Sequence, residues 1–145
     1  MRPIARRHAA GFTLAEVVMA MAVAAILVAL SYSGYSSSVQ KTRRAEAVAT
    51  LISVAGRMEQ YYAEHGVYTD DLTKLGFNKA QALPTENGYY EVSASIPTNQ
   101  TFLITAKRVG AQVADERCGD LTIDHVGAKS AVNRTDQSPT ENCWE

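Results

Sequence analysis

The first apolar run in the chain covers residues 12–30 and reads FTLAEVVMAMAVAAILVAL, with Glu16 as its only charged residue. An α-helix of that length spans about 28 Å, which is close to the hydrocarbon thickness of a bilayer. The next segment, residues 31–38, reads SYSGYSSS, and serine and glycine are poor helix formers in a helix interior. The pattern therefore predicts an apolar helix that could cross a membrane, followed by a segment of weaker helical character.

A second helical pattern runs from Val39 to about His65, with apolar residues recurring at steps of three and four. Gly66 follows it and is suited to cap the C-terminus of a helix. If one helix runs unbroken from Phe12 to His65, its length is about 80 Å. Such a helix is far too long to be enclosed by a chain of 145 residues, so its apolar half is expected to project. The residues expected on the core face of the second half are Ala45, Val48, Leu51, Ile52, Ala55, Met58 and Tyr62.

The remaining chain has the pattern of a loop followed by a sheet. Residues 66–88 are rich in turn signals and are predicted to form the loop. Three short segments with strand character follow, and residues 96–100, which include a proline and an asparagine, separate the first two as in an antiparallel hairpin. The sequence therefore predicts an α+β fold, in which a long N-terminal helix packs its second half on an antiparallel sheet of three to four strands. The predicted strands are Tyr89–Ser95, Thr101–Arg108 and about Leu121–Val126, and residues 127–145 form a polar, turn-rich end.

This pattern divides the chain into a short basic leader at residues 1–11, an apolar helix at 12–38 and a globular head at 39–145. The predicted parts of the head are the amphipathic helix half 39–65, the loop 66–88, and the sheet with its C-terminal loop 89–145.

The leader and apolar run are open to three interpretations. A secretory signal peptide has the same layout and could end near Ser31, and a plain membrane anchor needs only the apolar length. Neither explains Glu16, because a carboxylate within a membrane segment is costly and usually functional. Cleavage between Gly11 and Phe12 explains it, because the new amino group would lie about one helical turn from the carboxylate, in the same chain or in a neighbouring one.

Charge is unevenly placed along the chain, although the formal net charge is only −1. Arg2, Arg6 and Arg7 lie in the leader, so its removal lowers Lys+Arg from 14 to 11 against 15 acidic residues and leaves a net charge of −4. An acidic head gives no general argument for nucleic-acid binding. The pair Arg43-Arg44 is predicted to lie on a solvated helix face or at the membrane edge, with binding of DNA or lipid headgroups as the alternative.

The two cysteines, Cys118 and Cys143, both lie late in the chain. In an exported protein such a pair favours a disulfide, and with His125 between them they still lack the usual four-ligand spacing of a zinc site. The sequence contains no Gly-rich phosphate loop and no evident nucleophile–base spacing. It therefore predicts a disulfide-closed C-terminal region and no enzymatic activity, metal or cofactor.

The block Gly11-Phe12-Thr13-Leu14-x-Glu16, with a basic leader before it and an apolar run after it, resembles the class III prepilin signal of type IV pilins and pseudopilins. The resemblance implies cleavage after Gly11 by a prepilin peptidase on the cytoplasmic face, N-methylation of Phe12, and a role for Glu16 in subunit docking. It also implies a single-pass protein of the bacterial inner membrane that later enters an extracellular filament.

Later motifs are similar to those of PilE-type minor pilins, so the resemblance extends over nearly the whole chain. It implies a structural subunit whose partners are other pilins and the pilus assembly machinery, and whose filament supports twitching motility, adhesion or DNA uptake. A type II secretion pseudopilin and a DNA- or surface-binding pilin are the alternatives. These motifs are Arg43-Arg44-Ala45-Glu46-Ala47, Glu59-x-Tyr61-Tyr62, Gly66-x-Tyr68-Thr69, Gly88-Tyr89-Tyr90, Cys118-Gly119-x-Leu121-Thr122-Ile123-Asp124 with Gly127, and Cys143-Trp144.

Overall fold

The computed structural model of the protein describes residues 11–132, 135 and 140–144. The chain divides into two compact units, with the boundary between Ser37 and Ser38. The helix α1, Leu14–His65, contributes residues to both units. Of the predicted leader, only Gly11 is among the described residues.

The long N-terminal helix predicted from the sequence is present, and it begins two residues later than expected. Phe12 and Thr13 precede its first turn, and the helix continues through the serine-rich segment 31–38. Gly66 ends it in the left-handed conformation, with φ +72°, and its N–H donates to the carbonyl of Tyr62 at 2.8 Å. Glycine adopts this conformation without the steric penalty of a Cβ atom, which explains why the helix ends there.

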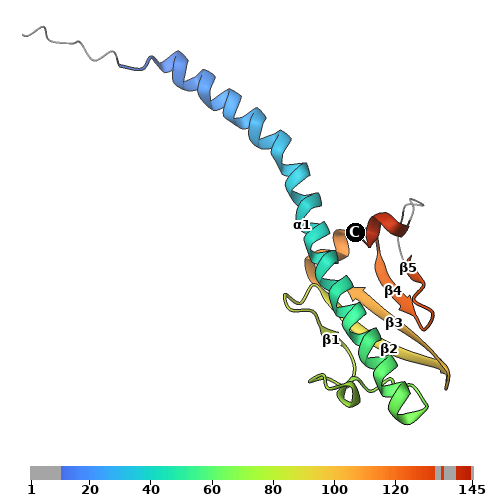
Figure 1. Cartoon of the computed structure of the whole chain (residues 1–145). Helices are drawn as coiled ribbons and strands as arrows, with labels where there is room; N and C mark the ends of the chain where they lie inside the picture. Colours follow the sequence, from blue (N-terminus) through green and yellow to red (C-terminus); the bar gives the residue numbers. More distant parts are fainter. Residues whose placement is uncertain (1–10, 133–134, 136–139, 145) are drawn as a thin grey trace, which may run out of the picture. The chain divides into compact units, whose positions relative to one another are not determined.

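The second unit contains one antiparallel sheet of five strands in the order β1-β2-β3-β4-β5 (Figure 1). The expectation of three to four strands was too low. The two additional strands, β1 (Leu83–Pro84) and β5 (Lys129–Val132), lie in segments that were predicted as the loop and as the polar, turn-rich end. Each is too short, at two and four residues, to show an alternating pattern. The strands are β1 Leu83–Pro84, β2 Tyr90–Thr98, β3 Thr101–Arg108, β4 Asp120–Asp124 and β5 Lys129–Val132, and short 3-10 helices lie at η1 Leu72–Leu75, η2 Gly110–Ala114 and η3 Thr140–Cys143.

The predicted hairpin is formed by β2 and β3, which pair from Tyr90↔Arg108 onwards. The strands continue past the expected end of β2 at Ser95, and the register shifts between Ser95 and Thr98. Pro97 lies within this irregularity. Because proline has no N–H to donate to a ladder, it is tolerated in a strand at a bulge or an edge. The proline therefore interrupts the pairing and does not end the strand.

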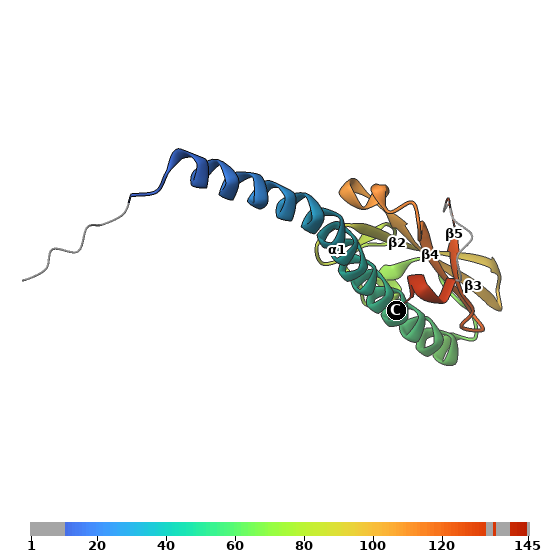
Figure 2. The same cartoon turned by 90° about the horizontal axis from the view of Figure 1, so that it is seen from above.

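The second half of α1 lies across one face of the sheet (Figures 1 and 2), and the apolar core of the second unit fills the space between them. The buried face of the helix differs from the predicted one. Ala45 and Ile52 are exposed, whereas Ala47 and Val54 are fully buried. Apolar residues at helical spacing occur on two neighbouring faces of α1. Packing against the sheet buries the face that also carries Arg44. The core residues from α1 are Ala47, Leu51, Val54 and Met58, joined by Tyr90, Val92, Phe102, Ile104, Ala106, Leu121 and Ile123 from the sheet.

Candidate functional site

The first turn of α1 is capped by two residues from the predicted processing block. The N–H and the hydroxyl of Thr13 each donate to Glu16 Oε2 at 2.9 Å, and the N–H of Glu16 donates back to Thr13 Oγ1 at 3.3 Å. This reciprocal arrangement is a capping box, which satisfies backbone donors that a helix start otherwise leaves free. The Thr-x-x-Glu spacing is a sequence signature of this motif, so the role of Thr13 could have been found from the sequence and was missed.

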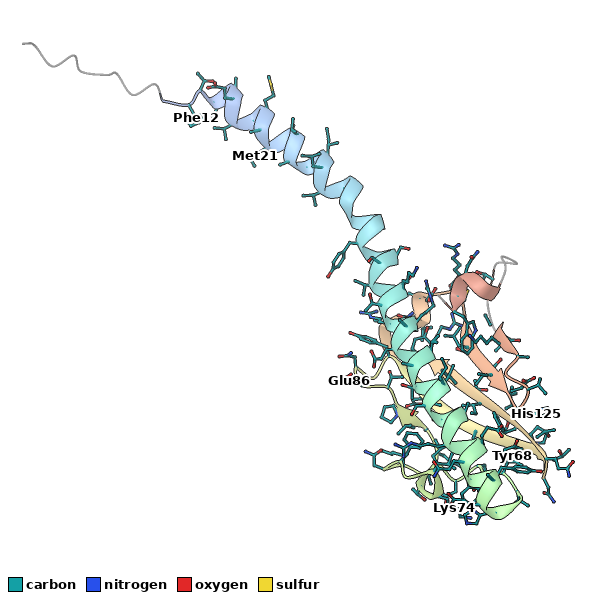
Figure 3. The ribbon with its side chains drawn as sticks, in the orientation of Figure 1. Phe12, Met21, Tyr68, Lys74, Glu86 and His125 are labelled. Carbon is teal, nitrogen blue, oxygen red and sulfur yellow. A yellow bond between two sulfur atoms is a disulfide. The ribbon has the colours of Figure 1, made fainter. Side chains whose placement is uncertain are left out.

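Large apolar side chains cover the first unit and are exposed to the surroundings. Phe12 is 87% and Leu14 85% exposed, and Figure 3 shows Phe12 and Met21 with side chains that point away from the helix. Within the described residues, α1 is the helix that is long and apolar enough to cross a membrane. Exposed apolar surface of this extent in one segment marks an interaction with lipid or protein. The exposed large apolar residues of this segment are Phe12, Leu14, Val17, Val18, Met19, Met21, Val23, Ile26, Leu27 and Val28.

One side of this segment combines Glu16 with small and apolar side chains. The six residues that line it recur at steps of three and four, as neighbours on one helix face do. Small side chains allow another helix to approach closely. This face therefore places the carboxylate where a packed neighbour could meet it. The residues of the face are Glu16, Met19, Ala20, Val23, Ala24 and Leu27.

Arg43 and Arg44 have different environments in the second unit, and the prediction of a solvated pair was wrong. Arg44 is buried, and its Nη1 lies 2.6 Å from Oδ2 of Asp115. The guanidinium of Arg43 lies 3.7 Å from the centroid of the half-buried Tyr89 ring. No local pattern indicated the acidic partner, because Asp115 lies 71 positions further along the chain.

The turn before β2 is fixed to α1 through Glu46. The N–H and the side-chain amide of Asn87 donate to the two Glu46 carboxylate oxygens at 2.7 and 2.9 Å. Burial raises the pKa of Glu46, but the hydrogen bonds from Asn87 outweigh it and hold the pKa below its usual range. Asn87 and Gly88 end the segment 66–88 that was predicted as a turn-rich loop, and the contact to the helix explains the fixed position of this turn.

The expected disulfide joins Cys118 and Cys143, whose Cα atoms are 5.4 Å apart. Both cysteines are buried. The neighbouring residue, Trp144, donates from its indole N–H to the carbonyl of Ser130 at 3.1 Å, and Nζ of Lys129 lies 5.4 Å from its ring centroid. The disulfide therefore holds the C-terminal segment against the edge strand β5.

The other candidates for chemistry in the second unit are two surface hollows. One, of about 300 Å³, is lined by Arg57, Lys74 and polar residues near Gly76, and one of about 370 Å³ lies between α1 and the turn after β4, beside His125. Among the described residues, no three His, Cys, Asp or Glu side chains come together as a metal site would require. The described part of the second unit thus offers hollows that can serve as contact surfaces.

Three comparisons with known proteins bear on this geometry. Residues 6–32 match the prokaryotic N-terminal methylation motif. The fold is that of a type IV pilin from Shewanella oneidensis, whose structure superposes with a TM-score of 0.52 over 73% of this chain and 98% of that one, at 24% identity. The chain is also 29% identical over 103 residues to the fimbrial protein EcpC of Eikenella corrodens, covering 69% of this chain and 64% of EcpC. Fold and N-terminal segment together define a type IV pilin.

A more specific match covers the larger part of the chain. Residues 33–122 match the family described as type IV minor pilin ComP, DNA uptake sequence receptor. The chain belongs to this family of type IV minor pilins. Pilin families are structural and not enzymatic, and the match to EcpC, the curated relative reported above, spans 64% of the length of that protein. The match to the minor pilin family favours the pilus over the type II secretion pseudopilus that the sequence left open.

Proposed function

We propose that the chain is made as a precursor anchored in the bacterial inner membrane and then enters a type IV pilus as a minor subunit through residues 12–38. The observation that carries this proposal is the exposed apolar surface of α1 between Leu14 and Val28, interrupted only by the charge of Glu16. Lipid covers that surface in the precursor, and the helices of neighbouring pilins cover it in the filament. Burial of apolar area favours both states, so extraction from the membrane exchanges one apolar environment for another.

Processing prepares the segment for assembly. A prepilin peptidase cleaves between Gly11 and Phe12, and the Phe12 amine is methylated. The new terminus lies next to Thr13, whose N–H and hydroxyl hold the Glu16 carboxylate at 2.9 Å. These hydrogen bonds supply no cation for the negative charge of Glu16, which is costly among apolar neighbours, so the Phe12 ammonium of an adjacent subunit is the partner expected in the filament. The partners of the chain are thus the peptidase, the assembly machinery and other pilins.

Glu16→Ala tests the docking role, with Thr13→Ala as the matched control. Each substitution removes part of the capping box: Glu16→Ala removes the carboxylate, whereas Thr13→Ala removes the hydroxyl and keeps the carboxylate for a neighbouring subunit. Glu16→Ala is expected to insert and to be cleaved normally, yet to be depleted at least fivefold in sheared filaments, while Thr13→Ala is incorporated normally. Incorporation of both variants at the wild-type level would reject the docking role. Equal depletion of both variants from filaments would show that Glu16 acts only by capping the helix.

DNA uptake is the second candidate function, and the match of residues 33–122 to a family described as a DNA uptake sequence receptor supports it. The head carries more acidic than basic residues, so contacts to DNA would have to come from a few cations placed locally. Binding of labelled duplex DNA to sheared filaments is the test, measured between low and physiological salt. Each phosphate contact contributes about −0.9 to the slope of log K against log salt, so a slope near zero would exclude phosphate binding. Competition by DNA of shuffled sequence tests whether a specific sequence is read.

A further inference from the structure

A buried polar cluster joins α1 to the η2 region at the beginning of the second unit. Nη1 of Arg44 and Oδ2 of Asp115 are 2.6 Å apart, and their side chains are only 9% and 1% exposed. On the other side, the main-chain carbonyl of Asp115 accepts a hydrogen bond from Nη1 of Arg108 at 2.6 Å. Asp115 therefore connects the helix to strand β3.

The second connection is made by Gln112, which is fully buried. Its Nε2 lies 3.0 Å from Oδ2 of Asp115, 3.2 Å from the hydroxyl of Tyr90 and 3.4 Å from the main-chain carbonyl of Gln40. Gln40 and Arg44 are one helical turn apart on α1. The η2 region thus holds two successive turns of the helix, one through a side chain and one through the backbone.

This arrangement is an inefficient way to stabilise a fold. Nε of Arg44 and Oε1 of Gln112 are buried and find no hydrogen-bond partner among the described residues. Desolvation of a buried ion pair can exceed the attraction that it gains, and apolar residues of similar shape often replace such a pair without loss of stability. Buried polar groups can instead specify one register between packed elements. The cluster therefore fits a positioning role better than a stabilising one.

The part of α1 just before the cluster differs from the part after it in exposure. Residues 34–38 are all exposed, and they belong to the serine-rich segment that has low intrinsic helix propensity. Helical structure there depends on its own backbone hydrogen bonds. From Arg44 onwards, buried residues recur on the helix. The polar cluster therefore lies where α1 changes from an exposed segment to a segment with one buried face.

We propose that Arg44, Asp115 and Gln112 form a clamp that fixes the point on α1 up to which the helix can unwind or bend. Residues from Gln40 onwards keep their helical register on the sheet, and conformational change during extraction and filament entry is confined to the residues before Gln40. The proposed function requires only the apolar surface of α1, so this clamp is an additional property. Arg44 and Gln112 act in it as positioning residues.

Hydrogen exchange measured by mass spectrometry on the full-length protein, in detergent and in sheared filaments, tests the clamp. In the wild type, amides in residues 40–48 should exchange at least tenfold more slowly than those in 34–38. In the double variant Arg44→Met, Asp115→Leu, apolar side chains can preserve global stability but no longer specify one register of the helix on the sheet, so protection of 40–48 should fall at least tenfold. Protection of β2 and β3 should change less than twofold, because their ladder is not altered.

A second variant keeps the test decisive if the double variant folds poorly. Gln112→Leu removes the contact to the Gln40 carbonyl without leaving a lone charge, and it should lower protection of 40–48 in the same way. Asp124→Asn is the control, because Asp124 Oδ1 accepts hydrogen bonds from the N–H groups of Val126 and Ala128 in the turn after β4, outside the cluster. Unchanged protection of 40–48 in both variants would overturn the clamp. Equal loss of protection in helix and sheet would show a merely structural role and would overturn it as well. Processing and filament entry can remain normal in either case, which separates this result from a failure of the proposed function.

Discussion

A Cβ atom at Gly76 would lie only 2.8 Å from Nη1 of Arg57. The arginine reaches from α1 to the end of η1, where Nη1 donates to the carbonyl of Leu75 at 2.9 Å. Its guanidinium also lies 4.6 Å from the centroid of the Phe77 ring. Gly76 itself is left-handed, with φ +83°, and caps η1. The loop between helix and sheet thus depends on a residue without a side chain.

Gly76→Ala is therefore expected to destabilise the protein for two reasons. A left-handed conformation costs a residue with a Cβ atom about 1–2 kcal/mol, and displacement of Arg57 adds to it. Gly127→Ala is the matched control, because Gly127 has φ +77° but no atom within 4 Å of an added Cβ. Urea unfolding should show a larger loss for Gly76→Ala, and Arg57→Ala in the same chain should remove part of the difference. Equal losses at both glycines would show that the arginine yields without cost.

Processing between Gly11 and Phe12 predicts the mass of the mature protein. Purified filaments should contain a chain that lacks residues 1–11 and carries one added methyl group, because the block from Gly11 to Glu16 resembles a prepilin signal. Intact-mass spectrometry with fragmentation of the N-terminal peptide gives the measurement. A mature chain that begins at Ser31 or Tyr32 would instead establish a secretory signal peptide. Substitution of Gly11 by a bulky residue should leave the full precursor in the membrane.

Loss of the disulfide should loosen the C-terminal region and leave the N-terminal segment unchanged. For Cys143→Ser, opening a loop with a sequence separation of 25 removes about 3–4 kcal/mol by the chain-entropy estimate, against a typical total stability of about 5–15 kcal/mol. The C-terminal region should become sensitive to protease and surface piliation should fall, while cleavage after Gly11 continues. Trp144 is the only tryptophan, so its fluorescence should shift to the red as it leaves Ser130.

Thiol labelling provides the control for that prediction. Without reductant, the native protein should react at neither cysteine, because both are bonded and buried. Two freely reactive thiols would contradict the disulfide and this explanation of the C-terminal region. Wild-type fluorescence after Cys143→Ser would show that Trp144 is held in place by its other contacts.

Tyr90 predicts how stability depends on alkaline pH. Burial raises the pKa of its phenol to about 12, the hydrogen bond from Gln112 opposes the increase, and the negative charge of Asp115 adds to it. Since the unfolded phenol titrates near 10, the unfolded chain loses this proton first and stability falls as pH rises from about 10 to 12. Urea unfolding of Tyr90→Phe should show a shallower decline in that range. Tyr35→Phe, at a side chain that is 71% exposed, is the control and should keep the wild-type slope.

The features that local chemistry encodes could be read from the sequence. The apolar run with Glu16 at its start, the long helix ending at Gly66 and the hairpin of β2 and β3 each follow from periodicity or from a turn residue within a short window. The Cys118–Cys143 bond was also expected, because two cysteines in an exported chain have a single way to pair. In each case the local sequence was compatible with few alternative structures.

Tertiary structure decided the features that depend on distant partners. It selected Ala47 and Val54 for the core over Ala45 and Ile52, although both stripes on α1 have helical spacing. It also paired Arg44 with Asp115, 71 positions away. A local pattern shows that a side chain can be buried or charged, but the choice among possible partners is made by the free energy of packing the whole domain, so only the folded head determines it.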